Sequence, residues 1–233
     1  MTIDQAGLRQ LHHVHQRLED LRSRMARGPM QIKAMEAKVA RQEEELKTQQ
    51  DQNKRHKLNQ ADRELQLKER ENRIHDYRGK LNSCSSNKEY QALMERIAAD
   101  EQANSVLSDE ILELMDKVIA VTEVIVASRA TLEKSQGELE ALRQRVAAER
   151  AILEVDVGAM EARLREAELI LPADARPGYD RVVKAHGADA LAVIEEGTCG
   201  GCSQTVTPQM INELRMSRLV ACKNCGRLLY LPE

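Results

Sequence analysis

Apolar residues recur at alternating steps of three and four along most of this chain. From Tyr90 to Ala167 they share one heptad register, whose gaps hold polar residues such as Asn104 and Ser128. Roughly eleven heptads on a single register are typical of a coiled coil and not of a globular helix. The sequence therefore predicts one long helix in this region, and Pro172 ends it.

The first half of the chain repeats this pattern less regularly. Between residues 32 and 81, apolar side chains such as Val39 and Ile74 share a register with polar ones such as Asn53. A shorter amphipathic helix precedes them, and we expect it to end or kink at Gly28-Pro29. Residues 81–87, LNSCSSN, form the turn-like cluster between the two long patterns. We therefore predict an antiparallel helical hairpin over residues 1–171 that turns near residues 82–88.

The charge distribution supports this hairpin. Residues 1–82 carry a net charge of +5 and residues 83–171 a net charge of −8. An antiparallel hairpin lays the basic arm along the acidic arm, whereas a parallel dimer of straight helices would set like charges side by side. The charges favour the hairpin over that alternative.

The middle of the second arm carries more apolar surface than one neighbouring helix covers. Leu112, Met115, Ile119 and Val126 add a second apolar line beside the heptad register. One interpretation is that the long Gln and Arg side chains of the first arm cover this surface. The other is that a second copy of the chain, as a homodimer, or a helix of another protein binds there. In that case the expected contact residues are Leu107, Ile111, Leu114 and Val118.

Four cysteines near the end of the chain indicate a metal site. Cys199 and Cys202 form one C-x-x-C pair and Cys222 and Cys225 another, with 19 residues between the pairs. This spacing is typical of structural zinc, because two tight turns can direct four sulfurs at one ion. A redox pair and a four-thiolate iron site are the alternatives. Four thiolates leave no open position for water, so we predict structural Zn²⁺ and no catalysis at the metal.

The remaining residues, 172–233, are predicted to form a linker helix and a small zinc ribbon with short strands. Residues 190–198 read as a strand that enters the first cysteine pair, and Thr207-Pro208 as the start of a helix. Cys84 lies in the hairpin turn and is interpreted as a bystander. His12, His13 and His15 point in different directions on a helix, so we interpret them as surface and seam residues.

Two stretches together resemble a known family. The segments SSNKEYQALMERI and CGGC…CKNCGRLLY are similar to those of bacterial coiled-coil proteins with a C-terminal four-cysteine zinc ribbon, which are flagellar or secretion-associated regulatory adaptors. Ser203 stands where many ribbons have Gly. The resemblance implies a non-enzymatic adaptor with the four cysteines as zinc ligands and a contact point at the hairpin tip, Lys88, Glu89 and Tyr90. Members are described as binding an alternative sigma factor and, in one case, a messenger RNA, so a transcription or secretion component is one expected kind of partner.

Composition narrows the remaining functions. The chain is 31% charged and 2% aromatic, without Trp or Phe, and it lacks the roughly 18-residue apolar run of a membrane span. Its start does not resemble a signal peptide, so we expect a cytoplasmic protein. We found no Gly-rich phosphate loop, nucleophile elbow or paired-carboxylate pocket, and we expect no enzymatic activity. Protein binding is the favoured function, and RNA or DNA binding through the ribbon is the alternative, with contacts at Arg215, Arg218, Lys223 and Arg227.

Overall fold

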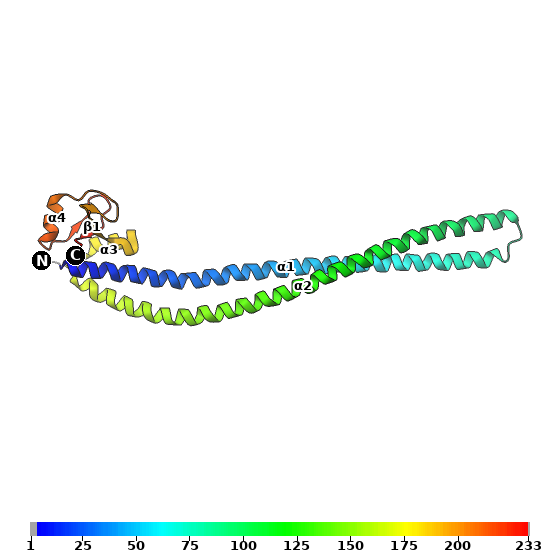
Figure 1. Ribbon diagram of the computed structural model, residues 1–233, viewed down its shortest axis with the longest axis horizontal. Helices are drawn as coiled ribbons and strands as arrows, with labels where there is room; N and C mark the ends of the chain where they lie inside the picture. The colour runs from blue at the N-terminus through cyan, green and yellow to red at the C-terminus, as the bar shows by residue number, and fades with distance from the viewer. Residues whose placement is uncertain (1–3, 233) are drawn as a thin grey trace. The chain divides into compact units, whose positions relative to one another are not determined.

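Two long helices make up most of the protein. The computed structural model describes residues 4–232, so the outer ends of the two predicted domains, residues 1–3 and 233, lie outside the described part. Helix α1 spans Gln5–Leu81 and helix α2 spans Asn87–Ala167 (Figure 1), and the chain reverses between them. A small region of strands with four cysteines follows. The predicted fold class, a helical hairpin followed by a small ribbon, is confirmed.

The chain divides into two compact units. The arm unit comprises Ala34–Glu140, and the ribbon unit comprises Met1–Lys33 together with Ala141–Glu233. The ribbon unit therefore contains the first turns of α1 and the last turns of α2 as well as the cysteines. Within residues 4–232, no helix is long and apolar enough to cross a membrane.

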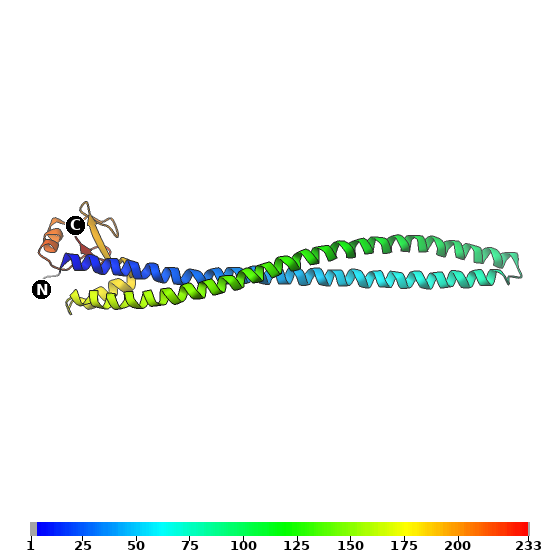
Figure 2. The ribbon, with the colours of Figure 1, turned by 60° about the horizontal axis from the view of Figure 1, so that its bottom comes forward.

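In the arm unit, α1 and α2 run antiparallel, and the views in Figures 1 and 2 both place them side by side. Ion pairs join the basic helix to the acidic one: Arg63 Nε lies 3.2 Å from Glu110 Oε2, and Arg78 Nη2 lies 2.6 Å from Glu101 Oε1. Exposed pairs of this kind contribute about 0–1 kcal/mol each. Their common direction, basic α1 to acidic α2, agrees with the antiparallel arrangement predicted from the charges.

The interface between the helices of the arm unit is partly polar, as its sequence register predicts. Apolar side chains such as Val39, Ile74 and Ile97 are buried there. Asn53 is buried as well, and its Nδ2 donates a hydrogen bond to Thr122 Oγ1 at 3.1 Å. Four buried amide oxygens have no hydrogen-bond partner in the described chain, those of Gln42, Gln49, Asn53 and Asn104. A polar interface of this kind fixes helix register at a cost in stability.

In the ribbon unit, α1 continues through Pro29. The prediction that the helix could end at Gly28-Pro29 is therefore wrong. An added Cβ at Gly28 would lie 2.6 Å from Val146 Cγ1 of α2, so the glycine allows the two helices to approach closely. Proline removes one backbone hydrogen bond from a helix interior, and we attribute the continuity of α1 to this close packing against α2.

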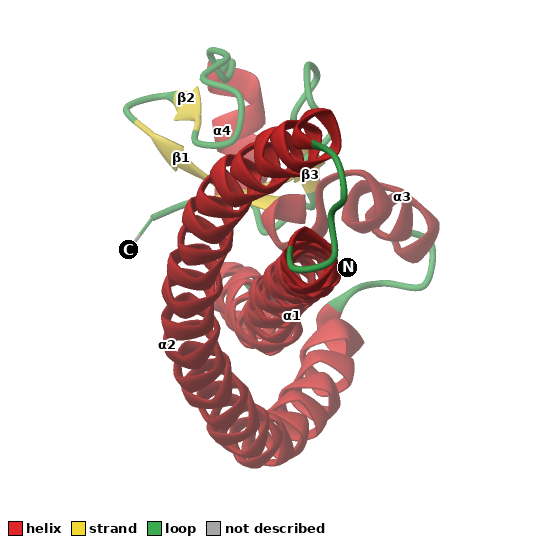
Figure 3. Ribbon diagram, turned by 90° about the vertical axis from the view of Figure 1, so that its right-hand side faces the viewer, coloured by secondary structure: helices red, strands yellow, loops and turns green. Residues whose placement is uncertain are grey.

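The rest of the ribbon unit consists of short elements (Figure 3). A 3₁₀ turn, Glu168–Ile170, follows α2, and then come α3 (Arg176–His186) and a second 3₁₀ turn (Gly187–Ala190). The remaining elements are β1 (Leu191–Glu195), β2 (Thr198–Cys199), α4 (Pro208–Arg215), β3 (Val220–Ala221) and β4 (Leu228–Tyr230). The sheet order is β2-β1-β4-β3, with β1 and β4 parallel and the other pairs antiparallel. Thr207 caps α4, as predicted, because its Oγ1 accepts a hydrogen bond from the Met210 N–H.

The hydrophobic core of the ribbon unit begins on α1. Leu8 and Leu11 are fully buried in a cluster with Leu191 of β1 and Tyr230 of β4. A second cluster lies around the cysteines and includes Leu214 of α4. The ribbon sheet thus uses the start of the chain to complete its core, which compensates for its very short strands.

Two histidines of α1 belong to this core. His12 and His15 are only 8% and 6% exposed, whereas His13 is exposed. His12 Nδ1 lies 2.8 Å from the Tyr230 hydroxyl, and His15 Nε2 lies 2.5 Å from the Tyr179 hydroxyl. The Tyr179 hydroxyl donates to Glu168 Oε1 at 2.9 Å, so His15 must donate its Nε2–H to Tyr179. The interpretation of all three histidines as surface and seam residues is therefore wrong for His12 and His15, which bind the ribbon and α3.

These contacts predict a pH-dependent stability. Burial lowers the pKa of His12 and of His15 below the usual 6.5, and the neighbouring carboxylates of Asp189 and Glu168 offset this only in part. Below pH 6.5 the unfolded state therefore binds more protons than the folded state. The stabilisation is complete above pH 6.5 and is lost as the pH falls through the lowered pKa values, with a slope of at most about 1.4 kcal/mol per pH unit for each histidine.

We expect the unfolding midpoint of the zinc-loaded protein in urea to decrease between pH 7 and pH 5. Replacement of both residues, His12→Gln with His15→Gln, should flatten this decrease, and His13→Gln should leave it unchanged. Zinc affinity also decreases as the pH decreases, because protons compete for the thiolates. Zinc release must therefore be followed in the same samples. If the unfolding midpoint decreased equally with pH in the wild type and in the double variant, His12 and His15 would not be the source of the pH dependence.

Candidate metal centre and contact surfaces

The four cysteine sulfurs converge at one point of the ribbon. Cys199 and Cys202 lie on the loop that starts at β2, and Cys222 and Cys225 on the loop between β3 and β4. All four Sγ atoms lie within 4.8 Å of one another, with Cys199 and Cys225 separated by 3.9 Å and Cys202 and Cys222 by 3.7 Å. Tetrahedral zinc with bonds of about 2.3 Å requires S–S distances of about 3.8 Å. The arrangement fits structural zinc, as the sequence predicted.

The two cysteine loops have the same backbone design. The Ser203 N–H donates to the Cys199 carbonyl at 2.7 Å, and the Gly226 N–H donates to the Cys222 carbonyl at 2.9 Å. The residue after each second cysteine is left-handed, with φ of 58° at Ser203 and 77° at Gly226. Ser203 therefore adopts a conformation that suits glycine, and this explains why its position is commonly Gly in ribbons.

Half-buried Arg227, on the second cysteine loop, hydrogen-bonds to the first loop and to the 3₁₀ turn before β1. Its Nε donates to the Asp189 carbonyl at 2.8 Å, and its Nη1 donates to the Gly201 carbonyl at 2.9 Å. An added Cβ at Gly201 would lie 2.5 Å from Arg227 Cδ, so this close contact requires glycine. Arg227 was predicted as a nucleic-acid contact. In the structure its guanidinium donates to one carbonyl of the first cysteine loop, that of Gly201, and to the Asp189 carbonyl in the second 3₁₀ turn.

The thiols differ in their tendency to ionise before metal binds. Burial raises the pKa of Cys199 to about 12, whereas the Gln204 N–H, followed by the Asn224 side chain, lowers the pKa of Cys202 to about 6. Zinc binds thiolates and so displaces the remaining protons. A four-thiolate shell leaves no position open to water or substrate, and zinc at this site would hold the two loops together.

Residues 198–229 match the family model of the C4-type zinc ribbon domain. This segment is a zinc ribbon. The match and the sulfur geometry together support Zn²⁺ as the structural cofactor. A search among curated proteins found no relative of the chain.

Three solved structures resemble the whole chain in fold. The CT398 protein of Chlamydia trachomatis has a TM-score of 0.66 at 18% identity, and the match covers 98% of this chain and 94% of that one. The HP0958 protein of Helicobacter pylori also has a TM-score of 0.66, at 14% identity with 99% of both chains covered. A protein of Mycobacterium smegmatis has a TM-score of 0.56 at 16% identity, with coverage of 98% and 99%. At these identities the likeness concerns the fold alone.

The predicted tip residues are all accessible. Lys88, Glu89 and Tyr90 are exposed in the first turn of α2, where Ser86 accepts hydrogen bonds from the N–H groups of Glu89 and Tyr90. Cys84 is half-buried in the turn, and its Sγ donates to the Lys80 carbonyl at 3.4 Å.

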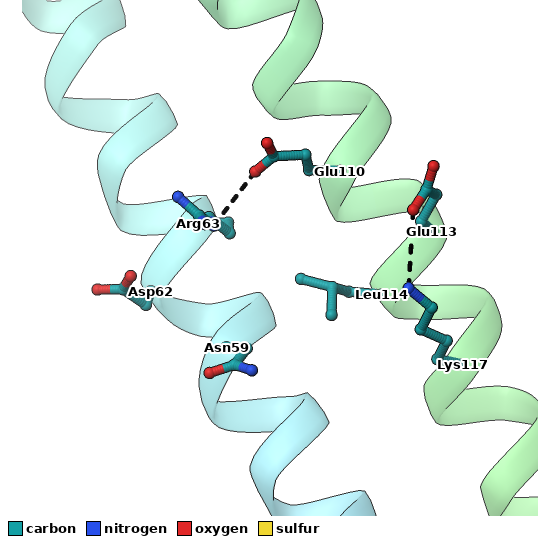
Figure 4. A pocket seen from close by; sticks show the side chains of 7 residues that line it. All are labelled: Asn59, Asp62, Arg63, Glu110, Glu113, Leu114 and Lys117. Carbon is teal, nitrogen blue, oxygen red and sulfur yellow. Dashed lines mark ion pairs between the residues drawn. The ribbon is translucent and has the colours of Figure 1, made fainter.

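The predicted contact residues in the middle of α2 turn out to face α1. Leu107 and Ile111 are buried, and Leu114 and Val118 are half-buried. Leu114 lines a pocket of about 310 Å³ whose other lining residues are polar (Figure 4). Two ion pairs lie among its lining residues, Arg63 with Glu110 between the helices and Lys117 with Glu113 within α2. The four predicted contact residues, Leu107, Ile111, Leu114 and Val118, therefore pack within the arm unit. The accessible apolar surface lies elsewhere on α2.

The accessible surface is the second apolar line noted in the sequence. Its members are 41–65% exposed and follow helical spacing: Leu112, Met115, Ile119 and Val126. We call this set the α2 stripe. The heptad register contained the signal that separates the two lines, since residues on the register face α1 and the stripe lies beside it.

Proposed function

We propose that this protein is a non-enzymatic adaptor that binds a protein partner through the α2 stripe. The observation that carries the proposal is the exposure of four large apolar side chains on one line of one helix. Exposed apolar side chains that gather on one line of a helix are typical of interaction sites, whereas scattered apolar residues are not. Zinc with four thiolates supports the non-enzymatic part of the proposal, because it offers no reactive position.

The stripe suits a helical partner. Leu112, Met115 and Ile119 are spaced by three and four residues, and Val126 lies seven residues beyond Ile119, a spacing that matches the anchors of an amphipathic helix. Three exposed carboxylates run beside the stripe at intervals of seven residues, on Asp109, Asp116 and Glu123. We therefore expect a partner helix with apolar anchors and basic residues along one edge.

From the family resemblance we further propose that the protein is a cytoplasmic member of the bacterial zinc-ribbon adaptors. Its partner is then a component of transcription or secretion. Tip residues Lys88, Glu89 and Tyr90 are exposed, which makes them available as a further contact.

Ile119→Lys tests the stripe most directly. A lysine at this 56% exposed position keeps the helix intact but places a charge in the centre of the apolar line. We expect the variant to lose its co-purifying protein by roughly tenfold or more, which corresponds to about 1.4 kcal/mol or more of binding free energy. Val155→Lys is the matched control, because Val155 is a 72% exposed apolar residue of α2 outside the stripe.

Sedimentation of both variants distinguishes the two kinds of partner. A wild-type dimer that becomes monomeric only in Ile119→Lys would assign the stripe to a second copy of the chain. Equal recovery of a heterologous partner by Ile119→Lys and by Val155→Lys would overturn the proposal.

Nucleic-acid binding by the ribbon is the second candidate function. Its supporting observation is the exposure of Arg215, Arg218 and Lys223 on the ribbon. Binding to phosphates would weaken steeply with salt, and Arg215→Ala with Arg218→Ala would reduce that salt dependence. A binding curve that does not change with salt would count against this function.

A further inference from the structure

A groove of about 470 Å³ runs between α3 and the last strands of the ribbon unit. Much of its lining is apolar or small, with Pro177, Gly178 and Val182 on the side of α3 and Leu219, Ala221 and Leu228 on the side of the sheet. The zinc site uses none of these residues as ligands, although Ala221 directly precedes Cys222. The groove is therefore a surface feature next to the metal centre, distinct from it and from the α2 stripe.

The groove reaches the outer strand of the sheet at Ala221. The sheet order places β3 at the outside, with β4 as its neighbour in the sheet. The Cys222 N–H donates to the Arg227 carbonyl at 2.8 Å, so Cys222 and Arg227 form a hydrogen-bonded pair of the antiparallel ladder. Such pairs alternate with non-hydrogen-bonded ones, and Ala221 and Leu228 are the next pair. The N–H and C=O of exposed Ala221 therefore point away from β4, where another strand can bind them.

Three cationic side chains lie in the groove or next to β3 in the sequence. Arg181 lines the groove, and exposed Arg218 and Lys223 flank β3 on its two sides in the sequence. Asp174 is the acidic residue in the lining. An incoming chain with carboxylates next to its apolar side chains would complement this distribution.

We infer that the groove binds an extended acidic segment of a partner protein as an additional strand on β3. The segment pairs its backbone with Ala221, places an apolar side chain between α3 and the sheet, and directs carboxylates to Arg181, Arg218 and Lys223. Strand addition of this kind derives affinity from main-chain hydrogen bonds and selectivity from the pocket. A nucleic-acid strand could use the same cations, but it could not pair with the strand edge.

This inference goes beyond the proposed function, because it adds a second and chemically different contact. The α2 stripe would bind a basic amphipathic helix, and the β3 groove would bind an acidic extended segment. A protein with both could hold two partners, or two parts of one partner, at separate places on one chain.

Gly178→Tyr tests the inference with a matched control. Gly178 lines the groove in α3, and an added Cβ there would meet no atom within 4 Å, so tyrosine fills the groove without a clash at its base. Gly158→Tyr introduces the same residue at an α2 glycine that is equally open. Zinc content and thermal unfolding should match the wild type in both variants.

The probe is a display library of random peptides, selected on full-length, zinc-loaded protein. We expect enriched peptides in which apolar and acidic residues alternate. Their binding should weaken roughly tenfold or more in Gly178→Tyr and in Arg218→Glu, and remain unchanged in Gly158→Tyr and in the stripe variant Ile119→Lys. Retention by Ile119→Lys separates the two surfaces, so either assignment can fail alone.

Three outcomes would overturn the inference. The first is a selection that enriches no peptide. The second is enrichment of peptides that bind Gly178→Tyr as well as they bind the wild type. The third is competition by a single-stranded oligonucleotide that depends on Arg218 and not on Gly178, which would assign the cations to nucleic acid.

Discussion

Removal of zinc should unfold the ribbon and leave the two long helices helical. The ribbon strands have five, two, two and three residues, too few to form a stable sheet without the metal. Zinc binding contributes roughly 10–16 kcal/mol to the folding of small zinc domains. The long helices pack along each other in the arm unit and do not depend on the cysteines. We therefore expect chelation to change far-UV circular dichroism little and to make residues 187–232 sensitive to protease.

Cys222→Ser should have the same effect without a chelator, because a serine hydroxyl does not replace a thiolate on zinc. Cys84→Ser is the matched control, since Cys84 is outside the cluster of four sulfurs. We expect about one zinc ion per chain in the wild type and in Cys84→Ser, and almost none in Cys222→Ser. A ribbon that stays protected from protease in Cys222→Ser would show that the hydrophobic clusters alone maintain it.

Leu11→Ala should destabilise the ribbon unit by about 2–5 kcal/mol, the usual cost of a buried Leu to Ala change. Leu11 is 0% exposed in the cluster that joins α1 to β1 and β4. The substitution leaves a cavity beneath the sheet and does not alter a zinc ligand. We expect the first thermal transition to occur at a lower temperature while zinc content remains unchanged at room temperature.

Leu58→Ala provides the comparison, because Leu58 lies on the same helix and is 62% exposed. Its effect should stay within about 0.5 kcal/mol. If Leu11→Ala had an equally small effect, the start of α1 would not be part of the ribbon core. The folding of the ribbon would then be independent of the first turns of the chain.

The sequence contained enough information to predict the hairpin and the metal site. Helical periodicity and the turn cluster at residues 81–87 are local signals, and both read directly as two long helices. The spacing of Cys199, Cys202, Cys222 and Cys225 is local within each pair, and zinc geometry imposes the rest. Thr207-Pro208 predicted the start of α4 because helix capping is also a local signal, which depends on neighbouring residues.

Contacts between distant residues were not predictable in this way. His12 and His15 meet Tyr230 and Tyr179, which lie 218 and 164 residues later in the chain. Nothing in the helical pattern of α1 indicates that its first turns pack on a sheet. The hydrogen bonds from Arg227 to the Asp189 and Gly201 carbonyls likewise depend on the folded ribbon. The left-handed backbone at Ser203 was not predicted, although the glycine that many ribbons have at this position is a signal for it.

For the middle of α2, the sequence predicted the extra apolar surface but not which of its residues are exposed. The sequence revealed two apolar lines, but the residues predicted to bind a partner, such as Leu107 and Ile111, are those buried against α1. Position on the heptad register decides which line faces the neighbouring helix. The exposed line, the α2 stripe, is the one that remains available to another protein.

The proposal that this protein is a protein-binding adaptor is tested most directly by affinity purification from native cells, with half of the material treated with nuclease. The chain has four Tyr and no Trp, so it absorbs weakly at 280 nm and bound nucleic acid would dominate the spectrum. We predict that a protein partner survives nuclease treatment in the wild type and in Val155→Lys, and is lost in Ile119→Lys. A high 260/280 absorbance ratio that collapses on treatment, together with loss of all co-purifying proteins, would contradict the adaptor and assign the protein to nucleic acid.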